Sequence, residues 1–310
     1  MTPVSCLLCG GETSREIEGL IDNRFGAPGS WDIHRCRACG LEQTAPRPDA
    51  ATLKHLYETY YNDGGATAAR YAGWRERFLM SSLYRLFLKL DGDISFHGER
   101  GAGRLLDVGC NEGRGLALYR ANGFAPEGLE LNRVAAAAAR ARGFAVHEVD
   151  IADFRPKAPF DRIVLSNVLE HALDPRAMTS HVRRLLAQGG EAWISLPNAE
   201  SWLRRVFGRH WINWHVPYHI VHFTQARLAA LLAEQGFEIV DAHHITPALW
   251  AAQSAIAFSF AGRPDQARRL RSTILVAALM ALARGLLFPL LWLGNRLARG
   301  DCLVVKARRL

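Results

Sequence analysis

A short apolar run that ends in an acidic residue and a glycine-rich turn limits what this chain can fold into. The run reads Leu105-Leu106-Asp107-Val108-Gly109-Cys110-Asn111-Glu112-Gly113. Two further strand-like segments, 126–130 and 145–149, also end at acids, because Glu130 closes the first and Asp150 follows the second. Ligands of open α/β sheets bind at the carboxyl ends of the strands. We therefore expect three carboxylates at the mouth of one sheet.

The glycine turn does not match either of the common phosphate-binding turns. A dinucleotide fingerprint needs G-x-G-x-x-G, and neither Gly109 nor Gly113 begins one, because Asn111 and Leu118 interrupt the pattern. A P-loop needs a lysine, and none is near this turn. Both turns hold a phosphate at a helix N-terminus, where Asp107 would repel it. The pattern favours a cationic nucleoside.

S-adenosylmethionine has the required chemistry, because it carries an ammonium and a sulfonium group and no phosphate. Asp107 and the amides of the turn can hold its methionine end. The Glu130 carboxylate can accept hydrogen bonds from both ribose hydroxyls, and Asp150 can accept one from the adenine amino group. The turn residues assigned to this cofactor are Gly109, Asn111 and Gly113.

In these motifs the chain resembles the class I S-adenosylmethionine-dependent methyltransferases. The matching segments are 105–113, Glu130, 150–151, 160–171 and 189–198. The resemblance implies an enzyme with a doubly wound, seven-stranded, Rossmann-like α/β sheet. It also implies four further cofactor contacts, namely Leu131, Ile151, Ser166 and Asn167. The family usually has glycine where Asn111 stands, and Asn tolerates a positive φ better than most residues.

Alternating strand and helix patterns begin at Gly103 and predict a mostly parallel sheet. We predict strands near 104–108, 126–130, 145–149, 161–166, 191–196, 237–243 and 301–307, and helices near 113–122, 132–142, 175–187 and 225–235. If the order of the resembled family holds, the last strand lies antiparallel beside the fifth.

Two C-x-x-C-G motifs near the N-terminus predict a metal site. Their cysteines are Cys6, Cys9, Cys36 and Cys39. Four thiolates at this spacing form a closed, tetrahedral, structural zinc site on a ribbon hairpin. Two disulfides are the competing interpretation, and they suit a cytosolic chain poorly.

Helical spacing of apolar residues follows the ribbon at 49–61 and again at about 67–90. In the resembled methyltransferases, leading helices cap the cofactor, which makes Tyr60 and Tyr61 candidates for a lid or for ordinary core contacts. The predicted organisation is a zinc ribbon at 1–45, a helical cap at 46–102, a methyltransferase core at 103–246, a hydrophobic helical insertion at 247–299 and a final core strand at 300–310.

The segment 210–224 gathers four of the twelve histidines and four aromatic residues. It resembles the active-site insertion of bacterial methyltransferases that act on sugars or small metabolites. A neutral imidazole can accept a hydroxyl proton, so the candidate catalytic bases are His171, His219 and His222. Two alternatives remain open: a structural role with Thr224 as a helix cap, or a second metal held by His215, His219 and His222.

A second unusual segment, 272–297, is uncharged over 272–283 and 285–295, and Arg284 separates these two runs. A single membrane crossing would separate the final strand from the rest of the sheet. The alternatives are that this segment is buried in the core, packs in a dimer, or lies on the membrane surface. Flanking arginines suit an anionic membrane interface, while helices that are apolar all round are usually buried.

Net charge of +8 in 310 residues invites a nucleic-acid or membrane partner. Nearly all of that charge comes from arginine, a bias that genome composition can produce, so we expect no nucleic-acid partner. The N-terminus has no basic region followed by an apolar core. We expect a cytoplasmic chain that contacts the inner face of the membrane only peripherally, if at all.

The sequence thus predicts an O- or C-methyltransferase for a sugar, glycolipid or small metabolite in polysaccharide or secondary-metabolite synthesis. The acceptor class rests on the resemblance. An RNA base methyltransferase is the second hypothesis, although Ser166-Asn167-Val168-Leu169 stands where an N-P-P-Y-type tetrapeptide is expected. A binding protein without catalysis is the third, supported only by Asn111.

Overall fold

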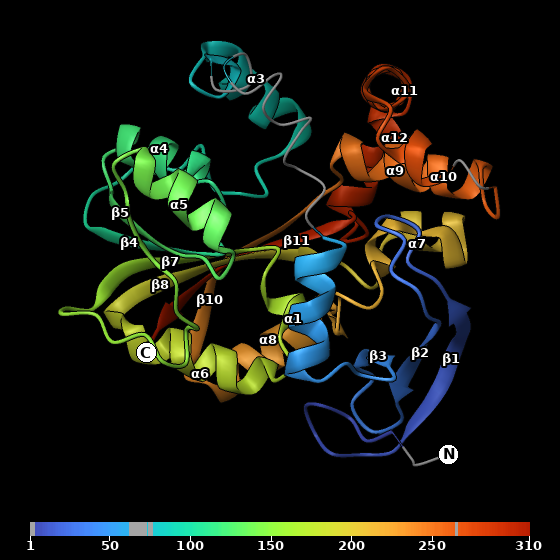
Figure 1. Cartoon of the computed structure of the whole chain (residues 1–310), viewed down its shortest axis with the longest axis horizontal. Helices are drawn as coiled ribbons and strands as arrows, with labels where there is room; N and C mark the ends of the chain where they lie inside the picture. The colour runs from blue at the N-terminus through green and yellow to red at the C-terminus, as the bar shows by residue number, and fades with distance from the viewer. Residues whose placement is uncertain (1–3, 62–72, 74–76, 264–265) are drawn as a thin grey trace.

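The computed structural model describes residues 4–61, 73, 77–263 and 266–310 (Figure 1). Its larger sheet has seven strands in the order β10-β11-β8-β7-β4-β5-β6. The strands are β4 (Arg104–Val108), β5 (Ala125–Leu129), β6 (Ala145–His147), β7 (Phe160–Ser166), β8 (Leu186–Pro197), β10 (Phe237–Ile245) and β11 (Cys302–Arg309).

The last strand, β11, is antiparallel to both of its neighbours, β8 and β10. The strands β4 to β8 pair in parallel. The predicted doubly wound sheet, with its final strand inserted beside the fifth, is confirmed. This order places the carboxyl ends of β4, β5 and β7 side by side.

Helices cover both faces of the large sheet (Figure 1). Helices α4 (Arg114–Ala121) and α5 (Arg133–Ala141) lie on one face, and α6 (Pro175–Leu185) and α8 (Gln225–Glu234) lie on the other. Successive residues of a strand point to opposite faces. Accordingly, Leu105 packs in the core with α4 and α5, while Leu106 packs in the core with α6 and α8.

Helix α4 ends at a turn that only glycine fits. Gly123 has a φ of 104°, and a Cβ built there would lie 2.3 Å from the carbonyl oxygen of Gly101. A glycine with positive φ after a helix satisfies the last carbonyl groups. The turn sets the direction of β5 and therefore the position of Glu130.

The smaller sheet has four strands in the order β1-β2-β3-β9. Strands β1 (Thr13–Leu20), β2 (Trp31–Cys36) and β3 (Glu42–Ala45) come from the N-terminal ribbon. Strand β9 (Val221–His222) comes from the histidine-rich segment after β8, and it pairs with β3. The predicted ribbon is therefore joined to the core through a shared sheet.

Within the described residues, helices α1 (Ala50–Thr59) and α3 (Ser82–Asp91) follow the ribbon. The helix expected over 67–90 is divided, because the hydroxyl of Ser81 accepts a hydrogen bond from the amide of Tyr84 and starts α3. Residues 67–72 and 74–76 of that prediction lie outside the described residues.

The hydrophobic insertion between β10 and β11 is helical. It contains α9 (Ala248–Ser259), α10 (Gln266–Leu270), α11 (Thr273–Gly285) and α12 (Phe288–Arg296). Among the described helices, no single one has both the length and the apolarity to cross a bilayer. Among the described helices, only the pair of α11 and α12 has sufficient length and apolarity when taken together, and the two helices are bent by 70° where they meet.

Asp301, at the start of β11, ties the histidine-rich segment to the sheet. This carboxylate is fully buried. One of its oxygens accepts hydrogen bonds from the Ser201 hydroxyl and from the Trp211 indole at 2.8 Å. The other oxygen accepts from the Asn213 amide at 2.9 Å. Three buried donors depend on this one acceptor.

We predict that Asp301→Ala lowers the free energy of unfolding by about 3 kcal/mol or more, because each buried donor left unpaired costs about 1–3 kcal/mol. Urea unfolding followed by circular dichroism measures this. The matched control is Asp241→Ala, which removes a half-exposed carboxylate from the neighbouring strand and should change stability by less than about 0.5 kcal/mol. Equal effects of the two substitutions would contradict the prediction.

Candidate functional site

The turn after β4 brings the predicted cofactor residues together. The amides of Gly109 and Cys110 donate to the carbonyl of Leu129 at 2.8 and 3.1 Å, which fixes the turn against β5. Gly109, Asn111 and Gly113 have φ values of 75°, 50° and 73°. Asn111 therefore takes the left-handed conformation that a glycine would adopt, and the turn keeps its shape despite the substitution.

Two carboxylates flank this turn. Glu130 accepts from the amide of Asn111 at 2.9 Å and from that of Asn132 at 2.7 Å, and each of its oxygens keeps a further lone pair. Asp107 is only 8% exposed, and its carboxyl group has no hydrogen-bond partner in the described part of the chain. Burial, followed by the charge of Glu130, raises the pKa of Asp107 to about 7.

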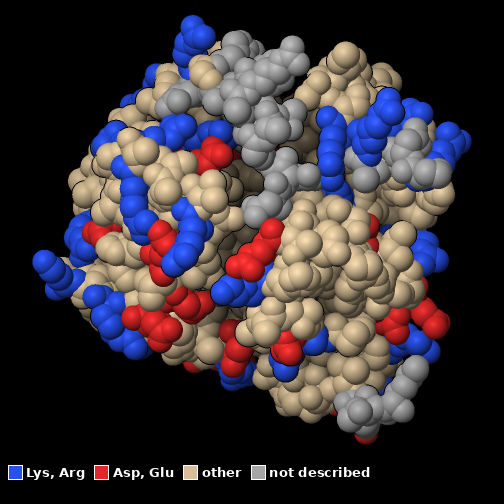
Figure 2. All heavy atoms as spheres, viewed as in Figure 1, with Lys and Arg blue, Asp and Glu red and all other residues tan. Residues whose placement is uncertain are grey.

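The remaining predicted cofactor residues lie after neighbouring strands. Leu131 follows β5 and is exposed, whereas Ile151 is buried. Asp150 is exposed after β6, and it accepts a hydrogen bond from the Ala152 amide at 2.8 Å. At the end of β7, the Ser166 hydroxyl donates to the carbonyl of Ile94, and Asn167 has a φ of 54°. All these residues share the carboxyl edge of the sheet. Figure 2 shows a hollow near the middle of one molecular face, with acidic side chains beside it.

A cluster of buried rings stands beside this edge. His171 lies in the short helix η1 (Leu169–His171) after β7, and its Nδ1 is 2.8 Å from the Tyr57 hydroxyl and 3.0 Å from the carbonyl oxygen of Tyr218. A carbonyl oxygen only accepts, so Nδ1 carries the proton and Nε2 carries the lone pair. Burial, opposed in part by the Tyr218 hydrogen bond, lowers the pKa of His171 to about 4.

His219 and His215 form the second layer of this cluster. The Nδ1 of His219 donates to the carbonyl of Asn213 at 2.8 Å, and its Nε2 lies 3.2 Å from Nδ1 of His215. The rings of His219 and His171 have centroids 4.7 Å apart. Burial lowers the pKa of both His215 and His219 well below the usual value, so all three imidazoles are neutral at physiological pH.

Glu170 is a buried acid that the sequence analysis did not select. It is 1% exposed, and neither of its carboxylate oxygens has a hydrogen-bond partner among the described residues. One oxygen lies 3.9 Å from Nε2 of His219, and burial raises the pKa of Glu170 to about 8. Glu170, His171 and His219 each present one potential ligand atom, all within 4.8 Å of one another. The sequence feature that could have identified Glu170 is its position next to His171.

Ribbon and cap residues complete the cluster, and most of these were also missed. Phe25, from the loop between β1 and β2, has its ring 4.7 Å from Tyr61 and 5.4 Å from His215. Tyr57 and Tyr61 on the cap lie 4.8 Å apart, ring to ring. Burial is the largest cause that raises the pKa of Tyr57, and the acids Glu170 and Glu130 add to it. The ring of Tyr57 lies 6.2 Å from that of His171 and the ring of Tyr61 lies 5.7 Å from that of His215, so the cap tyrosines contact the histidines.

Arg24 brings a positive charge to the same cluster. Its guanidinium donates to the Gln253 side chain at 3.3 Å, and its Nε is buried without a hydrogen-bond partner in the described segments. Its charge lowers the pKa of His171, His215 and His219. No sequence signal separates this arginine from the many others of the chain.

His222, the third predicted base, is separate from this cluster. Its Nε2 lies 3.1 Å from the Thr44 hydroxyl, and its ring packs edge-on against Trp214. It therefore connects β9 to the ribbon. The alternative metal set of His215, His219 and His222 does not converge on one point, because His222 turns toward Thr44. Thr224 caps α8 by accepting from the Arg227 amide, as predicted.

The four predicted zinc ligands do converge. Their sulfur atoms lie within 4.8 Å of one another, with Cys6 to Cys39 at 3.5 Å and Cys9 to Cys36 at 3.4 Å. Gly10 and Gly40 have positive φ, which lets each backbone turn under the sulfurs. Zinc–sulfur bonds of about 2.3 Å in a tetrahedron need sulfurs at such separations. The four-cysteine cluster is consistent with a zinc ribbon.

Contacts from this ribbon reach the histidine segment. The Thr44 hydroxyl donates to the carbonyl of His219 at 2.6 Å, and its amide donates to the carbonyl of Ile220 at 2.9 Å. The Ile220 amide in turn donates to the carbonyl of Glu170 at 2.8 Å. A chain of hydrogen bonds thus runs from β3 to the edge of the large sheet, and the ribbon positions the candidate site.

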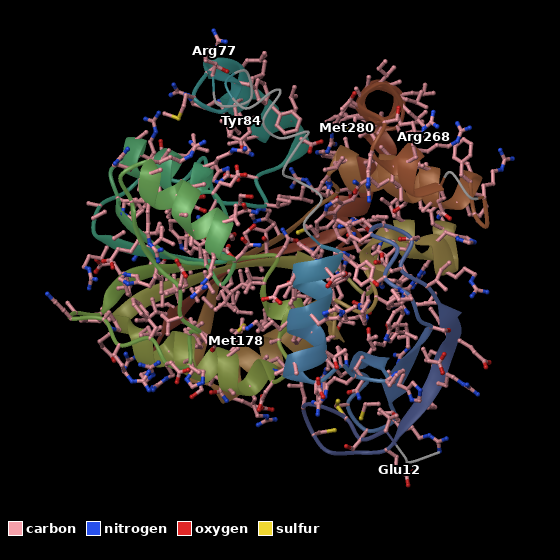
Figure 3. The ribbon with its side chains drawn as sticks, viewed as in Figure 1. Glu12, Arg77, Tyr84, Met178, Arg268 and Met280 are labelled. Carbon is pink, nitrogen blue, oxygen red and sulfur yellow. The ribbon has the colours of Figure 1, made fainter. Side chains whose placement is uncertain are left out.

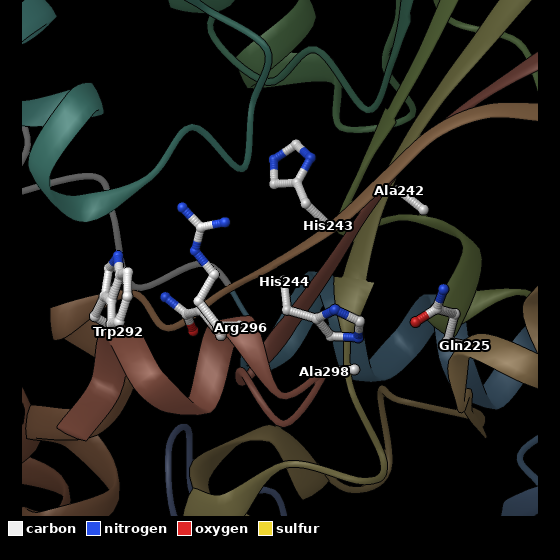
Figure 4. Close-up of a pocket in the computed structure, with 8 residues that line it drawn as sticks. Gln225, Ala242, His243, His244, Trp292, Arg296 and Ala298 are labelled. Carbon is white, nitrogen blue, oxygen red and sulfur yellow. The ribbon is translucent and has the colours of Figure 1, made fainter. Parts of the chain in front are cut away.

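A separate hollow lies between β10 and α12 (Figure 4). Its lining includes His243, His244, Trp292 and Arg296. None of the predicted catalytic, cofactor or metal residues lines it. It is distinct from the candidate site.

Comparison with known proteins identifies related chains. The family model described as methyltransferase domain matches residues 71–242. A Mycolicibacterium smegmatis protein named as a probable S-adenosylmethionine-dependent methyltransferase is 32% identical over 146 residues, which cover 46% of this chain and 55% of that relative. This match therefore spans about half of the relative's length.

Two solved structures are similar in overall shape. A methyltransferase from Thermotoga maritima is 17% identical, with a TM-score of 0.49 over 78% of this chain and 98% of that chain. One from Mesorhizobium loti is 21% identical, with a TM-score of 0.45 over 71% and 100% of the two chains.

We predict that purified protein carries about one zinc ion per chain and that Cys36→Ser loses it, because a structural site needs all four ligands. Elemental analysis measures the metal. Loss of zinc should also expose the amides of β9 to hydrogen exchange, since β9 pairs with β3. Cys302→Ala, which removes a cysteine outside the cluster, should keep the zinc. A zinc-free wild type that is stable to chelator would contradict the prediction.

Proposed function

This chain belongs to the S-adenosylmethionine-dependent methyltransferases, and we propose that it methylates an oxygen or carbon atom of a sugar, glycolipid or small metabolite. The observation that carries the proposal is the neutral His171, held at Nδ1 at the carboxyl end of β7, beside the edge that contains Asp107 and Glu130. This places a proton acceptor next to the residues proposed for the cofactor.

The residues at the edge fit the cofactor chemically. The Asp107 carboxyl group has no partner among the described residues and suits an ammonium group, while the spare lone pairs of Glu130 suit ribose hydroxyls. Asp150 and Ile151 would receive the adenine, and Leu131 would cover it. When bound, S-adenosylmethionine supplies an activated methyl group on a sulfonium.

His171 is proposed as the base. Its Nδ1 is held by Tyr218 and Tyr57, so that Nε2 keeps a lone pair that can accept a proton from an acceptor hydroxyl or carbon acid. His219 is proposed as a positioning residue, because its ring packs edge-on against His171 and its Nε2 faces Glu170. His222 has a structural role in this proposal.

The rings and the charge around His171 support a sugar acceptor that carries an anionic group. Phe25, Tyr57 and Tyr61, which pack around the buried Tyr218, supply flat apolar faces, and such faces pack well against sugar rings. Arg24 supplies a cation with an unpaired Nε, and a guanidinium binds phosphate well. A phosphate-linked sugar has both features. The ribbon contacts the histidine segment within the chain, and this structural role accounts for the ribbon without RNA binding.

We predict that the affinity for S-adenosylmethionine rises with pH through the pKa of Asp107, about 7 in the free protein. The raised pKa keeps the carboxyl group protonated at lower pH, and only the ionised form attracts the ammonium. The ionised fraction, and with it the affinity, should grow by roughly eightfold between about pH 6 and pH 7.5. Titration calorimetry measures this dependence.

Asp107→Asn is the control for this dependence, because it has nearly the same shape and cannot ionise. It should bind more weakly and with a flat pH profile over the same interval. An equal rise in the wild type and the variant would assign the titration to another group.

We predict that His171→Ala lowers kcat by about a hundredfold or more, the range expected for a lost general base. Its affinity for S-adenosylmethionine should change little.

Transfer of a labelled methyl group is measured on a panel of free, nucleotide-linked and lipid-linked sugars. The exposed His243 supplies the control, since His243→Ala should retain full activity. Full activity of His171→Ala on the best acceptor would refute its role, and no transfer to any sugar would refute the acceptor class.

A further inference from the structure

Exposed apolar side chains are concentrated on α11, α12 and the turn between them. The most exposed include Ile274 (83%), Leu286 (71%), Leu290 (55%), Leu297 (54%), Trp292 (49%) and Leu282 (48%). Soluble monomers rarely leave large contiguous apolar patches open, and such patches mark interaction sites. The expectation that all-round apolar helices would be buried therefore does not hold for this segment.

Helix α3 adds to the same surface. Leu83, Leu86 and Leu90 follow helical spacing and are each at least 51% exposed. In Figure 3, Tyr84 of α3, Met280 of α11 and Arg268 of α10 lie along the same upper edge of the molecule. We call the exposed faces of α3, α11 and α12 the apolar edge.

Arg284, the one charged residue between 273 and 295, does not interrupt this edge. Its guanidinium turns inward and donates to the carboxylate of Asp91 at 2.6 Å and to the carbonyl of Thr246 at 2.6 Å. Asp91 is the last residue of α3, so this pair also joins α3 to α11. The outward face is left without charge, and its two parts are held together.

Cations border α11 and α12, and acids are missing from this part of the sequence. Residues 266–300 contain no Asp or Glu, while Arg268, Arg269 and Arg271 precede α11, and Arg296 and Arg299 follow or end α12. Figure 2 shows Lys and Arg side chains gathered over the part of the molecule that holds α10 and α11. An apolar face with a basic border complements an anionic lipid surface.

We propose that the apolar edge seats this protein on an anionic bilayer, with α11 and α12 lying in the interface rather than crossing it. Their lengths of 13 and 9 residues are each well short of the ~20 residues that a crossing needs. Leu and Trp side chains would enter the boundary between headgroups and acyl chains, and the arginines would meet the lipid phosphates.

A second copy of the chain fits this surface less well. Two-fold pairing places the same patch against itself, so its arginines would approach one another, and residues 266–300 supply no acid to pair with them. The insertion is also connected to the candidate site, because the Ser254 hydroxyl on α9 accepts from the Ile212 amide at 3.1 Å. The membrane-facing helices and the histidine segment are therefore held together.

Vesicle sedimentation tests the proposal with the full chain. Wild-type protein should sediment with vesicles of phosphatidylcholine and phosphatidylglycerol, less with phosphatidylcholine alone, and less at high salt. The double variant Leu286→Ser, Leu290→Ser should bind the anionic vesicles with an affinity at least about tenfold lower than that of the wild type. Arg268→Glu should selectively weaken binding to the anionic vesicles.

The matched control is Ile21→Ser, Leu310→Ser, which removes two apolar side chains of similar exposure that lie outside α3, α11 and α12. It should bind vesicles like the wild type, and unchanged urea midpoints should show that both double variants fold. Wild-type protein that stays in the supernatant, or equal binding by both double variants, would overturn the proposal. Analytical ultracentrifugation supplies a further test. The proposal would also be overturned if the wild type is a dimer that does not bind vesicles and the Leu286→Ser, Leu290→Ser variant is a monomer.

Discussion

The pairing of β3 with β9 is the contact on which the candidate site depends. It is short, with two registered residue pairs, but Thr44 adds a hydroxyl and an amide hydrogen bond to the same segment. Without it, the loop that carries His215 and His219 would have few backbone partners on the ribbon side. The cysteine cluster folds the ribbon, the ribbon holds β9, and β9 holds the histidines. A structural metal would thus stabilise a site that it does not touch.

Burial sets the charge of this site. Asp107 and Glu170 are acids with raised pKa values, and the three clustered histidines are bases with lowered ones. In each case desolvation is the largest cause, since a charged group loses its hydration inside the protein. Burial therefore favours the neutral form of these five groups. A cationic cofactor would find further acids at the edge of the sheet.

Local patterns predicted the sheet well, because each strand combines an apolar run with a turn that only certain residues allow. The strand positions, the inserted last strand and the acids at the ends of β4 and β5 agree with the structure for this reason, although β8 begins at Leu186, five residues before the predicted strand. The cysteine spacing and the Thr224 cap agree as well, since both depend on near neighbours. Glu170, Arg24 and Phe25 were missed, because their importance comes from packing between segments that are distant in the sequence. His222 was grouped with His219 by spacing, yet β9 turns it toward the ribbon.

The sequence by itself determined the family, the edge of the sheet where the predicted cofactor residues lie and the four-cysteine cluster, because short-range geometry and residue chemistry carry that information. Only the tertiary structure decided which histidines meet, which buried acid joins them and where the charge of Arg284 goes. Arg284 appeared to interrupt an apolar segment, and its pairing with Asp91 leaves that segment with an uncharged outer face. Such outcomes depend on which distant groups are brought out of water together, and no local pattern in the chain encodes that directly.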